Sequence, residues 1–204
     1  MQRLYRITHY RFLPLMIFSI SLLSACSSTA PAQRQQYDFG PFNTVSLPNT
    51  KMQIALAEIQ VPAALDSNAM LYRLQYDNAQ QLKPYAQARW SMPPAQLVAQ
   101  RIKLVLNSRG AVVTNTADSA GSLPVLRLEL DEFSQVFTTP STSHAHIYAR
   151  GIVVKGRNII GTRNFLLQVP AASPDAASGA KAMQTAVDNM ISDMQQWLTS
   201  LALN

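Results

Sequence analysis

Two histidines separated by one residue, His144 and His146, are residues whose types and spacing suggest a chemical site. Alternate side chains of a β-strand lie on one face, so both imidazoles could bind a common metal ion. A protein metal site uses three or four ligands, however, and no acid or third histidine flanks this pair. We therefore predict no metal site and no cofactor, and we interpret both histidines as partly exposed strand residues.

A second candidate is the carboxylate pair Asp131–Glu132. Consecutive residues of a strand point to opposite faces, which prevents paired acid–base catalysis unless a bulge changes the geometry. No G-x-S-x-G sequence, the kind that exposes a nucleophilic serine, occurs in the chain. Three glycines at five-residue spacing fit neither a P-loop nor a dinucleotide-binding loop, which need a strand-to-helix turn; they are Gly151, Gly156 and Gly161. We predict no catalytic residues and no enzymatic activity.

Cys26 is the single cysteine of the chain, and the residues before it fall into three zones. A basic stretch comes first, then an apolar run over 12–23, and then Leu-Ser-Ala directly before the cysteine. This order is that of a secretory signal peptide, and Leu-Ser-Ala-Cys resembles the lipobox of bacterial lipoproteins. The resemblance implies cleavage before Cys26, diacylation of its thiol and acylation of the new amine. Cys26 has no second cysteine in the chain with which to form a disulfide. As a catalytic thiol it would need a base held on rigid structure.

The predicted domain boundaries follow from this lipidation site. Residues 1–25 are a lipoprotein signal peptide, residues 26–36 a flexible tether after lipidated Cys26, and residues 37–204 one domain. The apolar run is shorter than the ~20 residues that a membrane-spanning helix needs. Cleavage would remove three arginines and no acid, which lowers the formal net charge from +6 to +3. Because the remaining basic residues are scattered, we predict no binding to nucleic acid.

Ser27 follows the lipidation site directly. Resemblance to the sorted lipoproteins of enteric-type bacteria implies that aspartate at this position retains a lipoprotein in the inner membrane, whereas serine permits export. We therefore expect a lipid anchor in the outer membrane, with the domain in the periplasm.

Apolar alternation predicts strands before the first helix, over 52–61, 70–76 and 81–90. Pro84 places the third of these strands at a sheet edge, because proline cannot donate to the ladder. The last two strands read as a hairpin, since Asp77-Asn78 is a turn signal between them.

A longer strand is predicted over 123–137, and its apolar residues change phase part of the way along. A bulge near Asp131–Glu132 would return its leucines and its phenylalanines to one face. A turn over 138–143 leads to two further strands, over 144–154 and 159–169. Together these three strands predict an antiparallel meander.

Two helices complete the predicted fold. The first begins at Ser91, which can cap it, and ends at Gly110; the second runs to Leu201. The second helix carries apolar residues at heptad spacing: Met183, Val187, Met190, Met194, Trp197 and Leu201. We favour packing of this seam on the domain's own sheet over a seam between subunits of a homo-oligomer. The expected fold is a single α/β domain, a mixed sheet with an antiparallel meander and two long helices packed on it.

Arg89, Trp90 and Pro93 lie directly before the first helix and have two interpretations. Arginine and tryptophan are frequent anchors of protein interfaces, so the three residues are a candidate partner interface. A tryptophan at a helix start can equally fill the edge of the core, and we favour that interpretation for Trp90.

These features together resemble one family. Residues 61–73, the Arg89-to-Pro93 stretch that opens a helix, the strand over 128–137 and the alanine-rich start of the final helix follow the lipobox in order. In this order and spacing the chain is similar to the ABC-type transport auxiliary lipoproteins, which include the paraquat-inducible protein C-like lipoproteins. The resemblance implies an α/β domain without catalytic residues. It also implies partnership with MCE-domain (mammalian cell entry) proteins, which form conduits for lipid between bacterial membranes.

The expected function is therefore that of an outer-membrane lipoprotein that docks an MCE-type intermembrane lipid transport system without catalysing a reaction. A structural envelope lipoprotein with no direct role in lipid transport is the alternative. A periplasmic hydrolase is a third class, which the lack of a catalytic constellation disfavours.

Overall fold

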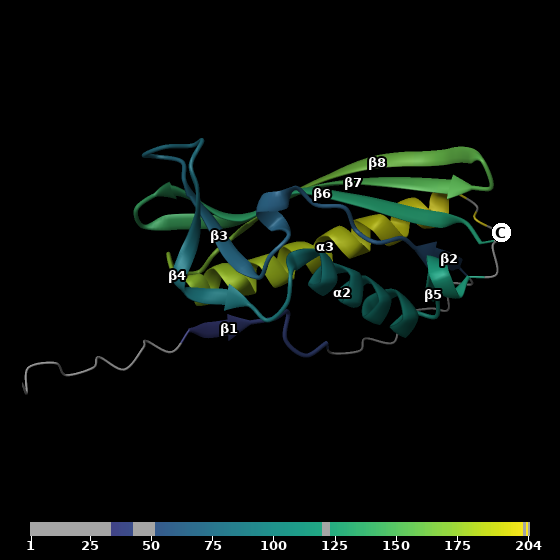
Figure 1. Ribbon diagram of the computed structural model, residues 1–204, viewed down its shortest axis with the longest axis horizontal. Coiled ribbons are helices and arrows are strands. Elements are labelled where there is room, and N and C mark those ends of the chain that lie inside the picture. The colour runs from purple at the N-terminus through teal and green to yellow at the C-terminus, as the bar shows by residue number, and fades with distance from the viewer. Residues whose placement is uncertain (1–33, 43–51, 120–122, 202, 204) are drawn as a thin grey trace, which may run out of the picture. The chain divides into compact units, whose positions relative to one another are not determined.

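The computed structural model describes residues 34–42, 52–119, 123–201 and 203. Within this part of the chain, eight strands form one sheet, and two α-helices and two short 3-10 helices complete the fold (Figure 1). The strands are β1 (Gln35–Tyr37), β2 (Gln53–Leu56), β3 (Ala69–Leu74), β4 (Leu82–Trp90), β5 (Val112–Asn115), β6 (Val125–Thr139), β7 (Thr142–Lys155) and β8 (Asn158–Pro170). The helices are η2 (Ala63–Leu65), α2 (Pro94–Ser108), η3 (Thr116–Asp118) and α3 (Ala176–Ser200).

The sheet is mixed, as predicted, and most of its pairings outside β6, β7 and β8 are parallel. Strand β6 pairs with β7 along its whole length, and β7 pairs with β8, both antiparallel. On its other side β6 pairs in parallel with β2 at one end and with β3 at the other. Strands β1 and β5 lie in parallel beside β4 and β2. The predicted meander therefore describes only the last three strands and misses these parallel contacts.

The predicted bulge in the long strand is confirmed. The register of β6 against β7 shifts between Leu130 and Glu132, which leaves Asp131 as the extra residue. Leucines before the shift and phenylalanines after it are buried on the same face. The bulge is therefore the reason that one strand with two hydrophobic phases has a single inner face.

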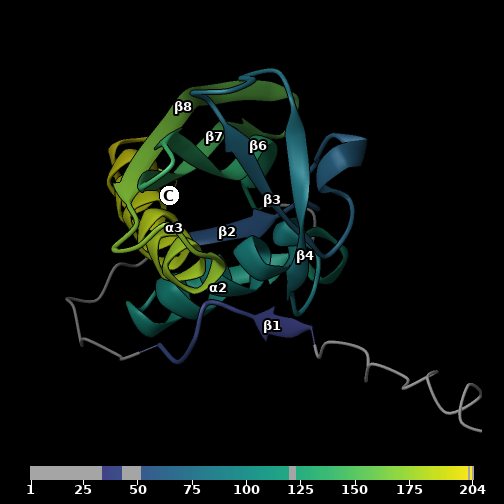
Figure 2. The ribbon, with the colours of Figure 1, turned by 90° about the vertical axis from the view of Figure 1, so that its left-hand side faces the viewer.

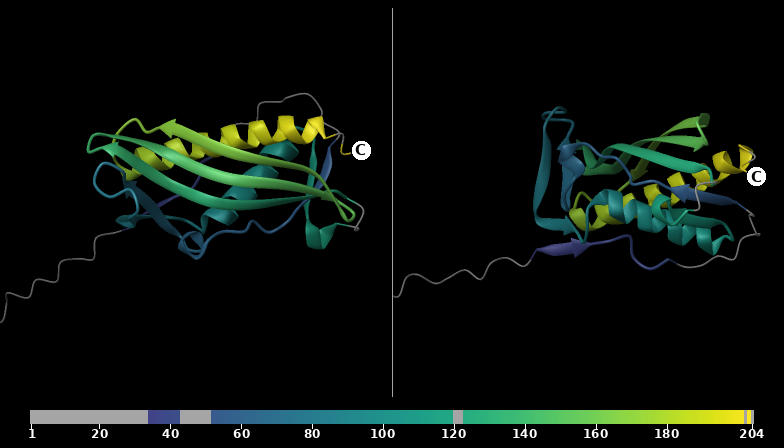
Figure 3. Two further views of the ribbon diagram at one scale, coloured as in Figure 1. Left: turned by 90° about the horizontal axis from the view of Figure 1, so that it is seen from above. Right: turned by 45° about the vertical axis from the view of Figure 1, so that its right-hand side comes forward.

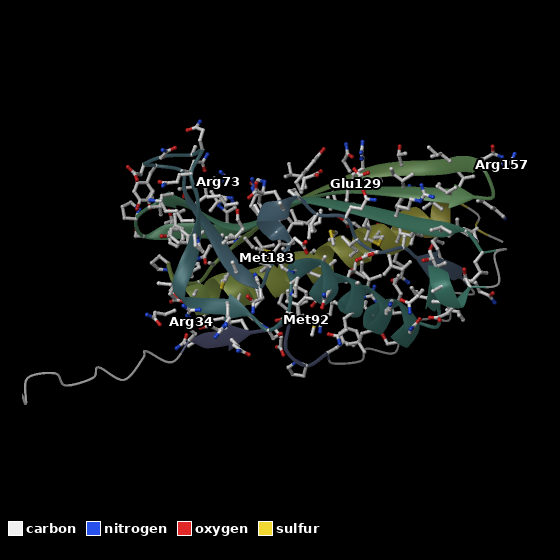
Figure 4. The ribbon with its side chains drawn as sticks, in the orientation of Figure 1. Arg34, Arg73, Met92, Glu129, Arg157 and Met183 are labelled. Atoms are coloured by element: carbon white, nitrogen blue, oxygen red, sulfur yellow. The ribbon has the colours of Figure 1, made fainter. Side chains whose placement is uncertain are left out.

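Helix α3 packs against the inner face of the curled sheet (Figure 2). The three long strands lie over it (Figure 3), and Met183 lies in the interior between these layers (Figure 4). The predicted seam is buried from Met183 to Trp197, which confirms that it packs within the domain. Only α3 is long, with 25 residues, whereas α2 has 15 and packs beside α3.

Two of the three equally spaced glycines make room for α3. A Cβ atom on Gly151 would lie 2.9 Å from the Trp197 ring, and one on Gly161 would lie 2.8 Å from the side chain of Leu201. Gly156 instead has a φ of 63°, in the hairpin between β7 and β8, where glycine avoids the steric cost of a left-handed backbone. The five-residue spacing therefore reflects packing and a turn.

Several predicted boundaries differ from the structure. Helix α2 begins at Pro94 with Pro93 as its N-cap and without a side-chain cap, so the expected Ser91 cap is wrong. Its predicted end is confirmed, since Gly110 has a φ of 85°. Strand β2 ends at Leu56, well before the expected residue 61. Strands β6 and β7 extend to within two residues of each other, so the predicted turn over 138–143 is too long.

The start of the domain also differs from the expected boundary. Strand β1 begins at Gln35, so the last two residues of the expected tether take part in the sheet. Strand β1 is short and polar, and it carries no apolar alternation from which it could be predicted. Of the described residues, no helix combines the length and the hydrophobicity that crossing a membrane requires.

Candidate interaction groove

The two residues predicted for lipidation and sorting, Cys26 and Ser27, lie outside the described residues. The other predicted site residues fall at three separate places in the fold: the outer face of β7, the end of β4 and the start of α2.

The histidine pair lies on the face of β7 opposite α3. The two rings are 5.9 Å apart between centroids. Nε2 of Gln168 lies 3.2 Å from Nδ1 of His146, whereas Nε2 of His144 is buried with no hydrogen-bond partner in the part of the chain that the structure describes. Burial and, secondarily, the neighbouring His146 lower the pKa of His144 below its ordinary value of 6.5. Among the described residues, no cluster of three or more histidines, cysteines or acids is placed to hold a metal ion.

On the neighbouring strand β6, the acid nearest to the histidine pair is Glu132, and its carboxylate already has other partners. Glu132 accepts a hydrogen bond of 2.6 Å from Ser134, which lies opposite His146. It also forms an ion pair with Arg73 at 3.1 Å. Glu132 is therefore held as an acceptor for other groups, and the pair is best described as two partly buried strand histidines.

The predicted interface residues do not form one surface. Trp90 is 1% exposed and makes edge-to-face contacts with Phe39 and Phe133, at 5.9 and 5.7 Å. The core interpretation of Trp90 is therefore confirmed, and as a fully buried side chain Trp90 cannot anchor a partner in this conformation. Pro93 is the N-cap of α2. Arg89 is half-buried, and its Nε atom has no hydrogen-bond partner among the described residues.

A groove of about 590 Å³ lies close to this region, between β1 and α3. One wall is formed by β1 and the residues after it, and the other by one face of α3. The floor is Arg101 of α2. Its lining is Gln36, Tyr37, Asp38, Gly40, Pro41, Phe42, Arg101, Ala177, Ala180, Lys181, Gln184 and Asp188.

Arg101 organises the floor of the groove. Its side chain is 4% exposed, and Nε and Nη2 each donate a 2.7 Å hydrogen bond to one carboxylate oxygen of Asp188. Nη1 donates to the carbonyl of Gly40 at 3.3 Å, and the guanidinium lies 5.0 Å from the ring centre of Phe42. One buried cation therefore joins both helices to the segment after β1. Such a bidentate pair is geometrically specific, and loss of one partner leaves a buried charge uncompensated.

The first wall is shaped by a turn directly after β1. The carboxylate of Asp38 accepts a hydrogen bond of 2.7 Å from the backbone N–H of Gly40, which has a φ of 61°. Between these two residues, Phe39 inserts into the core against Trp90. The turn thus directs the chain from the sheet edge toward Arg101.

The lining of the groove carries charged and polar side chains on both walls. None of its lining side chains, all of them described residues, is a serine, cysteine or histidine. The Asp188 charge is compensated by Arg101. The ammonium of Lys181, on the other wall, donates to the neutral amide of Gln184 at 2.8 Å. The groove therefore offers an exposed cation beside a strand edge.

Sequence reasoning missed this groove, although one signal was present. Arg101 lies four residues after Leu97 and three after Val98, which places it on the apolar face of α2. A charged residue on a buried helix face calls for a partner. That partner, Asp188, lies 87 residues further along the chain, so its identity could not be predicted locally.

Comparison with known proteins gives the family. A model of the ABC-type transport auxiliary lipoprotein component matches residues 40–195. The crystal structure of XCC0632 from Xanthomonas campestris, of family DUF330, is similar with a TM-score of 0.71 and 19% identity, covering 82% of this chain and 96% of that one. The structure of an uncharacterized protein has a TM-score of 0.65 and 14% identity, covering 81% and 99%. No curated protein matches the chain.

A third similar structure is that of the hypothetical protein CT253 from Chlamydia trachomatis. It has a TM-score of 0.50 and 11% identity, covering 76% of this chain and all of that one. At these identities the similar structures establish the fold.

The fold is an α/β domain with a curled mixed sheet around one long helix and a groove between β1 and that helix. The family match spans most of that domain. The chain belongs to the ABC-type transport auxiliary lipoprotein components, and its family name associates it with an ABC transport system. The predicted family is therefore confirmed.

Proposed function

We propose that this protein is a non-enzymatic lipoprotein of the outer membrane that docks an MCE-domain protein of an intermembrane lipid transport system. The observation that carries the proposal is the family match over residues 40–195, which begins shortly after the lipobox ending at Cys26. The predicted signal peptide, lipid anchor and periplasmic domain belong to the same proposal.

The physical basis is effective concentration. An anchor with two or three acyl chains holds the domain at one membrane surface, whereas a single chain binds only marginally. A partner that reaches this surface then meets the domain at a high local concentration, so a modest interface is sufficient to hold it there. The groove between β1 and α3 supplies such an interface, because it begins where the chain from the anchor joins the domain.

The test is co-purification. The tagged full-length protein is isolated from detergent-solubilised envelopes, and its partners and bound lipids are identified by mass spectrometry. We expect an MCE-domain protein and subunits of its transporter, with recovery reduced in a Cys26→Ala variant. Recovery of the lipidated protein without either would favour the structural envelope lipoprotein. Turnover of a substrate that survives loss of the anchor would instead favour a hydrolase.

A further inference from the structure

The edge of β1 that faces away from β4 forms one wall of the groove, and among the described residues no strand pairs with it. Strand β1 is the last strand of the sheet on its side among the described residues, with β4 as its neighbour. The carbonyl of Tyr37 accepts a hydrogen bond of 2.8 Å from the backbone N–H of Ser91, just after β4. In a parallel ladder, consecutive residues direct their polar groups to alternate sides. The N–H and C=O of Gln36 therefore point away from β4, toward the groove.

The opposite wall of this groove of about 590 Å³ belongs to α3. Five residues on one face of α3 line it, and the first two are alanines: Ala177, Ala180, Lys181, Gln184 and Asp188. A strand edge that faces a helix across a groove is suited to strand addition, in which main-chain hydrogen bonds give affinity. Gln36 is an exposed residue whose outward N–H and C=O supply the hydrogen bonds, and the short side chains of the alanines supply the room.

The charges in the groove select the chemistry of the added strand. Arg101 compensates Asp188, and Asp38 is exposed and accepts from Gly40. Lys181 is exposed, and among the described residues it contacts a neutral amide rather than an acid. A carboxylate of the incoming chain would therefore find its complement at Lys181, on the α3 wall.

We propose that the groove binds an extended segment of the MCE-domain partner, which adds to the free edge of β1 and places an acidic side chain against Lys181. This inference rests on the proposed function and specifies how the partner is recognised. Affinity would come from the backbone of Gln36, and selectivity from Lys181, the lining cation that forms no ion pair with an acid of the described residues.

The test compares two substitutions of one residue in the full-length, lipidated protein. Gln36→Pro removes the outward N–H but leaves the bonds from Tyr37 to β4, and proline is tolerated at sheet edges. Gln36→Ala removes the side chain and keeps the N–H, so it is the matched control. Binding of the purified MCE-domain protein of the same organism is measured in detergent, together with hydrogen exchange at the Gln36 amide.

We expect Gln36→Pro to weaken binding about tenfold, the effect of one lost hydrogen bond with its unpaired acceptor. Gln36→Ala should bind like the wild type. Lys181→Glu should weaken binding, whereas Lys181→Arg, which keeps the positive charge, should bind like the wild type. These two variants test the proposal even if the proline variant folds poorly. The Gln36 amide should exchange rapidly in the free protein and slowly in the complex.

Equal binding by the wild type, Gln36→Pro and Lys181→Glu would overturn this inference and leave the proposed function intact. A Gln36 amide already protected in the free protein would also overturn it, because the edge would then be occupied by the chain itself. Absence of wild-type binding would contradict the proposed function, and the inference with it.

Discussion

Gln135 shows how one buried side chain fixes the start of a helix. It is 1% exposed, and its Nε2 donates to the hydroxyl of Ser143 at 2.8 Å and to the carbonyl of Asp175, the N-cap of α3, at 3.2 Å. Its Oε1 accepts from the Tyr85 hydroxyl at 2.9 Å. Burial, then Tyr72 and Asp175, raise the pKa of Tyr85 well above its ordinary value, so this hydroxyl keeps its proton and stays a donor.

Gly179 is required beside this amide. A Cβ atom at this position would lie 1.8 Å from Oε1 of Gln135. We expect Gly179→Ala to destabilise the domain by about 2–3 kcal/mol in urea unfolding, since overpacking outweighs the higher helix propensity of alanine. In a Gln135→Ala background the same substitution should cost less, because the two substitutions share one contact. Strict additivity would show that the clash is not the cause.

His144 makes stability depend on pH. Its neutral form is favoured in the folded protein, so its pKa there lies below the value of 6.5 in the unfolded chain. The unfolded chain therefore binds more protons as the pH falls below about 6.5, and stability is lost toward acid. His146 faces it on the same strand, and the Arg73–Glu132 pair lies on the same outer face. Between pH 7.5 and 5.5, the melting temperature of His144→Gln should fall less than that of the wild type. An equal fall in both proteins would contradict this assignment.

At the scale of elements, α3 is the helix on which the sheet depends. Met190 is 1% exposed in the middle of its buried seam. We expect Met190→Asp to unfold the domain, because a carboxylate without a partner would be buried there. Asn189→Asp, at the exposed neighbouring position, is the matched control and should fold normally. Circular dichroism with light scattering on a variant lacking residues 1–26 is the measurement, and a folded monomer carrying Met190→Asp would disprove the assignment.

Elements with strong periodicity could be predicted from the sequence, and so could the bulge. The change of parity between Leu130 and Phe133 requires an extra residue in β6 if both are to be buried. The seam of α3 was identified by the same reasoning, from spacing alone. In both cases one buried face imposes a pattern that local sequence must obey.

Other elements left no local signal. Strand β1 has three residues, and what holds it is β4 and the neighbouring Phe39. The start of α2 was misplaced because Ser91 has a favourable capping side chain, whereas the two prolines that follow fix the backbone themselves. The Arg101–Asp188 pair depends on two helices that meet only in the folded chain. The groove therefore could not be predicted, because its residues come together only in the folded chain.

At the scale of the whole molecule, the proposed lipid anchor would decide where the domain acts. We expect Cys26→Ala to leave the protein unlipidated and uncut by the lipoprotein signal peptidase, since no other cysteine can replace the thiol. Mass spectrometry of the mature protein reports this directly. An unmodified Cys26 in the wild-type protein would remove the basis of the anchor.

Sorting gives a second prediction at this scale. We expect the wild-type protein in outer-membrane fractions of a sucrose gradient, and Ser27→Asp to move it to the inner membrane. Ser27→Ala is the control for loss of the hydroxyl and should leave sorting unchanged. Wild-type protein confined to inner-membrane fractions would argue against the expected location.

The position of β1 has a mechanical consequence. The chain that leads from Cys26 enters the domain at β1, which runs parallel to β4. A tension directed back along β1 loads its ladder in shear, so the hydrogen bonds must rupture together rather than open one at a time. Directly after β1, Phe39 is buried in the core, and Arg101 donates a hydrogen bond to the carbonyl of Gly40. An envelope tether would thus pull on a strand that is backed by a buried aromatic ring and a buried cation.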